Sequence, residues 1–159
     1  MDTARIDDGA ELVDMLLKGW EIEKQFESVS LAEVDRYATR PPLRKLMPQL
    51  ISDSNGHQLL VESMIGKVRT DRRRWDFSHH ISKYPFHMSW DAEMVKEIVR
   101  VERRMMEHYS EIYMRLNSSD SSVYLSLEDR EYVLEGLKRL VRDEGMHYRL
   151  ALTVSEAML

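Results

Sequence analysis

The sequence DSNGH at residues 53–57 is nearly repeated as DEGMH at residues 143–147, and each stretch lies within a run of apolar residues at helical spacing. Residues three and four apart share one face of an α-helix. Glu144 and His147 can therefore point at one common spot, and the aspartate and histidine of the first stretch can do the same at another. Two such spots on facing helices predict a metal site inside a helical bundle.

The composition restricts the fold to a helical one. The chain has 159 residues, 43% of them hydrophobic, which is the size of one domain with one core, and we expect residues 1–159 to form it. Only six glycines and four prolines occur, and no long run alternates apolar and polar residues as a strand would. These features predict an all-α protein.

Four helices follow from the apolar periodicity and from local start signals. Pro41-Pro42 forces a turn and suits the first turn of a helix, while Ser126 begins a capping box. The segment 30–38 either extends the first helix or forms a short separate one. The prediction is a four-helix bundle of two antiparallel hairpins joined by a long crossover at about residues 70–89, with helices over residues 8–26, 43–69, 89–116 (Ser89 as the cap) and 127–158.

Charge and residue content narrow the setting in which the chain works. Without cysteine it can form no disulfide and no thiolate metal site, so carboxylates and imidazoles must bind any metal. We see no signal peptide and no apolar run long enough to span a membrane, and we expect a soluble, cytoplasmic protein without a membrane partner. The net charge of -5 argues against a nucleic-acid partner, and the basic cluster at residues 69–74 is interpreted as a solvated helix end.

The neighbours at three, four and seven positions show which glutamates face the core. All six of these neighbours of Glu102 are apolar or aromatic, whereas Glu107 lies among arginines on the solvent side. Glu23 has Leu16, Trp20 and other core residues beside it. The same test predicts that a potential ligand faces inward from every helix: Glu23, His57, Glu102, and Glu144 with His147.

Burying a lone carboxylate costs several kcal/mol, so each of these glutamates needs a compensating partner. Protonation or an arginine serves a single glutamate, and a single buried histidine is more often a hydrogen-bonded core residue than a ligand. Ligands facing inward from four helices are more simply explained by a shared pair of divalent cations. Counting from the turn of each hairpin places Glu23 opposite His57 and Glu102 one helical turn from Glu144, so the levels agree.

Over most of its length the chain resembles the ferritin-like proteins, and among them the rubrerythrin-type di-iron domains. Their pattern is a glutamate on the first helix, Glu-x-x-His on the second, a glutamate followed seven residues later by tyrosine on the third, and Glu-x-x-His on the fourth. The resemblance implies two bound iron ions, and such ligands also suit manganese and zinc. The residues that match the pattern are Glu23, His57, Glu102 with Tyr109, and Glu144 with His147.

One position departs from this pattern, because Ser54 stands where the second helix should supply a glutamate. The remaining three glutamates then provide three negative charges against the four positive charges of a di-ferrous pair. Asp53, four residues before His57, is either a substitute metal ligand or a surface residue. Three states stay open: a di-metal centre completed by Asp53, solvent or an anion; a single-metal site; and a site that has lost its metal.

The resemblance implies a redox metalloprotein of peroxidase or ferroxidase type, in which a ferrous pair reacts with peroxide or oxygen. A chain without cysteine lacks the cysteine-bound iron domain of rubrerythrins, so an external electron donor would be needed, and we expect a homo-oligomer, a dimer. Two other functions stay open. One is a non-catalytic helical scaffold that binds a partner and keeps a degenerate metal site, which Ser54 favours; the other is an RNA-modifying di-iron oxygenase that uses the basic cluster.

Overall fold

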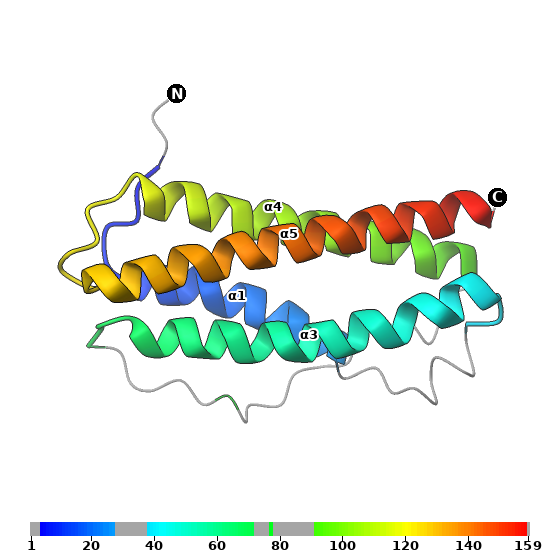
Figure 1. Cartoon of the computed structure of the whole chain (residues 1–159), viewed down its shortest axis with the longest axis horizontal. Coiled ribbons are helices and arrows are strands. Elements are labelled where there is room, and N and C mark those ends of the chain that lie inside the picture. Colours follow the sequence, from blue (N-terminus) through cyan, green and yellow to red (C-terminus); the bar gives the residue numbers. More distant parts are fainter. Residues whose placement is uncertain (1–3, 28–37, 72–76, 78–90, 159) are drawn as a thin grey trace.

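Four long helices make up the part of the chain that the computed structural model describes, namely residues 4–27, 38–71, 77 and 91–158 (Figure 1). No strand occurs among these residues, so the predicted all-α four-helix bundle is confirmed. The helices are α1 (Gly9–Glu27), α3 (Pro41–Lys67), α4 (Asp91–Asn117) and α5 (Leu127–Ala157).

The helix ends follow the predicted signals. Pro41 and Pro42 occupy the first turn of α3, where a helix does not use its amide protons. At the start of α5 the Ser126 hydroxyl accepts a hydrogen bond from the Asp129 amide at 3.0 Å and lies 2.8 Å from the Asp129 carboxylate. This pairing satisfies an amide that the helix itself cannot reach, and it confirms the predicted cap.

The sequence predicts that the second helix ends at residue 69, whereas α3 ends at Lys67. Helix α3 ends at Lys67 because Val68 is extended and the Arg69 amide donates to the Tyr124 carbonyl, at 2.9 Å, in the loop between α4 and α5. Several predictions lie outside the described residues: residues 30–37 of the segment 30–38, the cap at Ser89, most of the crossover and the arginines at 72–74.

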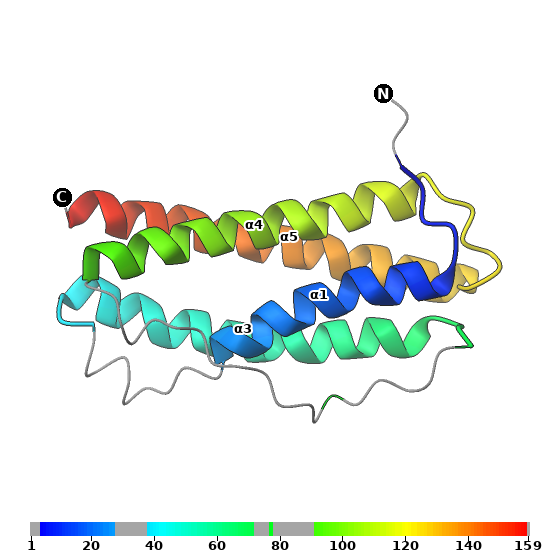
Figure 2. The same ribbon diagram turned by 180° about the vertical axis from the view of Figure 1, so that it is seen from behind.

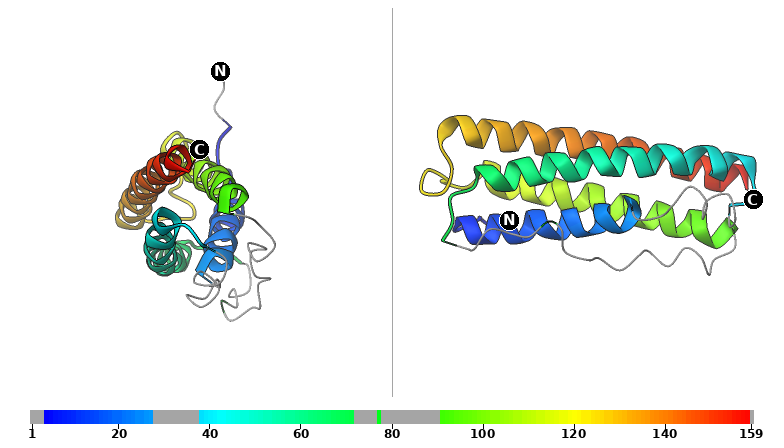
Figure 3. Two further views of the ribbon diagram at one scale, coloured as in Figure 1. Left: turned by 90° about the vertical axis from the view of Figure 1, so that its right-hand side faces the viewer. Right: turned by 90° about the horizontal axis from the view of Figure 1, so that it is seen from below.

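The helices pair as two hairpins. Helix α1 packs against α3 and α4 against α5, and the hairpins meet through α3 with α5 and α1 with α4. Helices α1 and α5 run one way along the bundle and α3 and α4 the other, so every packed pair is antiparallel (Figures 1 and 2). Lys67 and Asp91 therefore lie at opposite ends of the bundle, as the predicted crossover requires. Seen end-on, the four helices surround one core (Figure 3).

Apolar side chains from all four helices fill this core. Leu16, Trp20, Leu50, Ile98 and Leu137 are fully buried, each at the helical spacing that the sequence indicates. The polar residues predicted to face inward do so, and each is at most 4% exposed: Glu23, His57, Glu102, Glu144 and His147. The predicted contrast in α4 between a buried Glu102 and an exposed Glu107 is confirmed, since the Glu107 side chain is 56% exposed.

A glycine in α1 makes room for an aromatic ring beside these polar residues. A Cβ atom on Gly19 would lie 2.7 Å from Cε1 of the Tyr109 ring, which is fully buried and cannot retreat. A Cβ atom on Gly56 in α3 would meet no neighbouring atom within 4 Å. The two glycines therefore form a matched pair for substitution.

We expect Gly19→Ala to lower the free energy of unfolding by about 1–3 kcal/mol, because the added methyl group overpacks the core. Gly56→Ala should raise it by about 0.5–1 kcal/mol, because alanine stabilises an open helical position. Urea unfolding followed by circular dichroism measures both changes. Equal effects of the two substitutions would contradict the close approach of Tyr109 to α1.

Candidate metal centre

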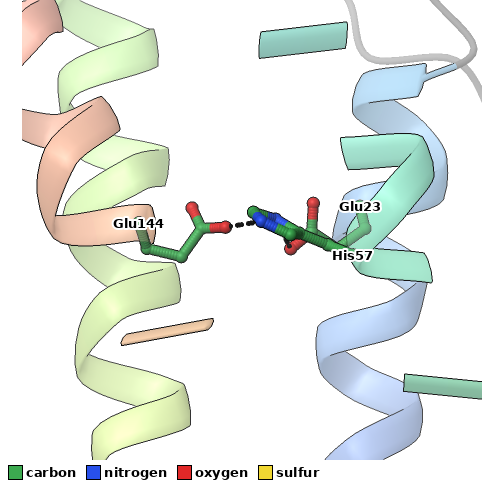
Figure 4. A group of neighbouring side chains, drawn as sticks. All are labelled: Glu23, His57 and Glu144. Carbon is green, nitrogen blue, oxygen red and sulfur yellow. Dashed lines mark ion pairs between the residues drawn. The ribbon is translucent and has the colours of Figure 1, made fainter. Parts of the chain in front are cut away.

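Two groups of buried ligand-type side chains meet at the middle of the bundle and share Glu144. One group is Glu23, His57 and Glu144, and the other is Glu102, Glu144 and His147. Within each group one ligand atom from every residue lies within 4.8 Å of the others. In Figure 4 Glu144 extends from α5 toward His57 of α3 and Glu23 of α1 on the opposite side. The groups therefore combine residues from all four helices.

The first group is closest at the Nδ1 atom of His57. This nitrogen lies 2.7 Å from Glu144 Oε1 and 3.3 Å from Glu23 Oε1. The 2.7 Å pair is not aligned as a hydrogen bond: His57 Nδ1 and Glu144 Oε1 both lack a hydrogen-bond partner within the described part of the chain. A buried ring nitrogen and a buried carboxylate oxygen thus face each other without the geometry of a hydrogen bond.

The second group repeats this arrangement with slightly longer distances. His147 Nδ1 lies 3.5 Å from Glu102 Oε2 and 3.8 Å from Glu144 Oε2. The two imidazole rings are neighbours, with centroids 5.7 Å apart. Each histidine therefore turns Nδ1 toward the carboxylates, and the two oxygens of Glu144 face different histidines.

The outer nitrogen of each histidine pairs with an aspartate from the opposite hairpin. His147 Nε2 lies 2.9 Å from Asp53 Oδ2, and His57 Nε2 lies 3.4 Å from Asp143 Oδ2. A carboxylate at one ring nitrogen fixes the orientation of the imidazole and leaves the other nitrogen as the ligand atom. We call Asp53–His147 and Asp143–His57 the crossed pairs.

The structure brings together five of the six residues predicted to bind metal and places the sixth, Asp53, behind His147. Its carboxylate contacts the outer ring nitrogen, and its side chain is 38% exposed. Asp53 is not a member of either group, so its role as a substitute ligand stays a prediction. Sequence reasoning did not assign a partner to Asp143, although the repeated Asp-x-x-x-His spacing was the available signal.

Two further contacts involve residues of α1 in and near the first group. The Tyr109 hydroxyl donates to Glu23 Oε1 at 3.2 Å, a contact that the sequence did not predict. One turn away in α1, the Trp20 indole donates to Glu62 at 2.9 Å, which gives this half-buried carboxylate a partner away from the centre. Sequence reasoning did not foresee the Trp20–Glu62 contact, because the two residues lie 42 positions apart.

The carboxylates dominate the electrostatics of both histidines. Burial alone would lower the pKa of His57, but Glu144 and Glu23 outweigh it and raise the pKa to about 10. Burial is outweighed in the same way at His147, where Glu102 and Glu144 raise the pKa to about 11. Burial also raises the pKa of Glu102 to about 8, against the opposing effect of His147. In the metal-free protein both imidazoles therefore hold protons at neutral pH.

This donor set fits divalent transition metals. Carboxylate oxygens and imidazole nitrogens are the ligands that iron, manganese and zinc accept in proteins. The unsatisfied Nδ1 of His57 and Oε1 of Glu144 face each other, and a cation between such atoms satisfies both at once. Binding would displace the imidazole protons, since a metal-bound nitrogen cannot carry one.

Comparisons with protein-family models, with curated proteins and with solved structures found no match for this chain. The bundle and its buried ligand groups are compatible with a ferritin-like fold. Among the described residues, no helix is both long and apolar enough to cross a membrane.

The raised pKa values predict how the stability of the metal-free protein depends on pH. The native state holds protons on His57 and His147 that the unfolded chain releases near pH 6.5, so stability is highest below that pH and falls as the pH rises toward 10–11. We expect the chelator-treated protein to lose about 2 kcal/mol or more between pH 6.5 and pH 9.5, measured by urea unfolding.

His147→Gln provides the control, because glutamine carries no titrating proton. Its stability should fall less steeply with pH than that of the wild type. A wild-type stability that stays level or rises over this range would contradict the proposed protonation of the two histidines.

Proposed function

We propose that this protein is a ferritin-like, rubrerythrin-type metalloprotein that binds two divalent ions, iron in the first instance, in its buried centre. Glu23 and His57 would hold one ion and Glu102 and His147 the other, with Glu144 shared between them. The observation that supports this most directly is the membership of Glu144 in both groups. One carboxylate that belongs to two sets of ligands would suit a pair of neighbouring cations.

We infer that the reaction is the oxidation of the metal pair by a small oxidant. When bound, two ferrous ions would supply the two electrons that reduce one hydrogen peroxide, with two protons, to two waters. The chain's own residues would orient the ligands. The crossed pairs hold the rings of His57 and His147 with Nδ1 inward, and the Tyr109 hydroxyl donates to Glu23. An external donor would return the electrons, since the chain has no cysteine for an iron–sulfur group.

The burial of the centre favours a small oxidant over a large substrate. Every residue of the two groups is at most 4% exposed. Peroxide and dioxygen can reach such a site through small fluctuations of the packing, whereas a nucleotide of an RNA chain would require the helices to separate. This burial therefore supports peroxidase or ferroxidase chemistry over RNA modification.

A second function, a partner-binding scaffold with a degenerate metal site, is favoured by the charge pairing of the metal-free centre. With both imidazoles protonated, Glu23, Glu102 and Glu144 already have cationic neighbours. The bundle can then keep its polar core without a metal, at some cost in desolvation. The two functions differ in metal content, which is directly measurable.

We expect the purified wild-type protein, loaded anaerobically with ferrous iron, to retain about two ions per chain. Glu102→Gln should retain about one, because Glu102 belongs to a single group, and Glu144→Gln should lose both. Glu107→Gln is the matched control: it changes an exposed glutamate on the same helix and should retain two. Elemental analysis after gel filtration measures all four proteins.

The loaded wild type should also consume about one peroxide for every two ferrous ions oxidised, followed by the appearance of ferric absorbance. Equal metal content in all four proteins would contradict the ligand assignment. A wild type that retains no metal, with unchanged helicity by circular dichroism, would favour the scaffold function.

The crossed pairs generate a separate prediction. Asp53→Asn should weaken binding of the ion held by His147 by about 10–100-fold, because the imidazole loses the carboxylate that orients it. Asp143→Asn should weaken binding of the other ion to a similar degree. Competition with a coloured chelator measures both affinities. Wild-type affinity in both variants would show that the aspartates play no part in positioning the ligands.

A further inference from the structure

The packing of the helices gives the two hairpins an approximate two-fold arrangement. Helices α1 and α4 correspond to each other in this arrangement, as do α3 and α5, and each corresponding pair is packed antiparallel (Figures 1 and 2). The crossed pairs obey the same relation, because Asp53 contacts His147 and Asp143 contacts His57. Residues 53–57 and 143–147 are therefore equivalent segments in space as well as in sequence.

This relation identifies the counterpart of Glu144. Glu144 lies three residues before His147, and Ser54 lies three residues before His57. Ser54 is 6% exposed, so it lies on the buried face of α3 with His57. The α5 side of the centre thus presents a carboxylate that both groups share, and the α3 side presents a residue too short to do so.

The charge of the centre is incomplete for the same reason. The carboxylates of the two groups supply three negative charges, while two divalent ions carry four positive charges and neutral imidazoles add none. The next carboxylates, Asp53 and Asp143, contact the outer nitrogens of the histidine rings, so they do not supply the missing charge on the inner side opposite Glu144. Glutamate differs from serine by a CH₂ and a carboxylate in place of a hydroxyl, and the non-hydrogen atoms of this CH₂ and carboxylate are those of an acetate ion.

We propose that the centre takes a small carboxylate-type anion from solution, such as acetate, formate or bicarbonate, at Ser54, where it completes the metal pair opposite Glu144. This proposal rests on the proposed function, since it requires two metal ions. It assigns to the site a class of exogenous ligand and makes binding of the second metal dependent on that ligand.

The test is a titration of chelator-stripped protein with Mn²⁺ in a sulfonate buffer, with and without acetate, followed by electron paramagnetic resonance of the free ion. In the wild type, acetate should tighten binding of the second ion by at least about tenfold, the effect expected for one added ligand. Ser54→Glu should bind two ions without acetate and respond to it less than about twofold, because its own carboxylate occupies the position. Glu107→Gln, which changes an exposed glutamate on α4, should behave like the wild type.

A second measurement does not depend on any variant. The wild type should retain one labelled acetate per chain through gel filtration when Mn²⁺ is present, and none when it is absent. Formate and bicarbonate in the same titration rank the three anions, and a response to any one of them supports the proposal.

The outcomes separate this inference from the proposed function. A wild type that binds two ions with equal affinity with and without every anion overturns the inference and leaves the metal centre intact. An acetate response of equal size in Ser54→Glu overturns the inference as well, because the anion then binds elsewhere. Failure of the wild type and of Ser54→Glu to bind Mn²⁺ in any buffer overturns both proposals.

Discussion

The central constraint on this bundle is the burial of Glu144 between two imidazoles, in a core that is mostly apolar. Its two oxygens face His57 and His147, and each histidine brings a second glutamate with it. A carboxylate in such surroundings is stable only next to positive charge, whether two protonated rings or bound cations. Each of the four helices must place its ligand residue at the same position along the bundle axis, so the register of the helices depends on Glu144.

The crossed pairs extend this constraint outward from the centre. Each imidazole has a carboxylate at both of its nitrogens, one buried and one near the surface. Asp143 also lies near the guanidinium groups of Arg139 and Arg142, which are exposed. The orientation of a core side chain is thus set in part by charges that reach the solvent.

Much of the fold and of the ligand set followed from the sequence, because helical periodicity determines which side of a helix is buried. Glu23 and Glu102 were separated from exposed glutamates by their neighbours alone. The partners of Asp53 and Asp143 were beyond this reasoning: the spacing of four residues suggests a contact within one helix, whereas the actual contacts join two helices. Periodicity gives the face on which a side chain lies, but contacts between helices also depend on their packing and rotation.

The two hairpins contribute unequally to the candidate metal centre, because one ligand of the α4–α5 hairpin is shared by both groups. Glu102, Glu144 and His147 all belong to the hairpin of α4 and α5, so that hairpin holds one complete group by itself. The hairpin of α1 and α3 supplies only Glu23 and His57, and its group is complete only after it docks against α5. A chain with a glutamate at position 54 would have two self-sufficient halves. In this chain the group of Glu23, His57 and Glu144 exists only where the two hairpins are packed against each other.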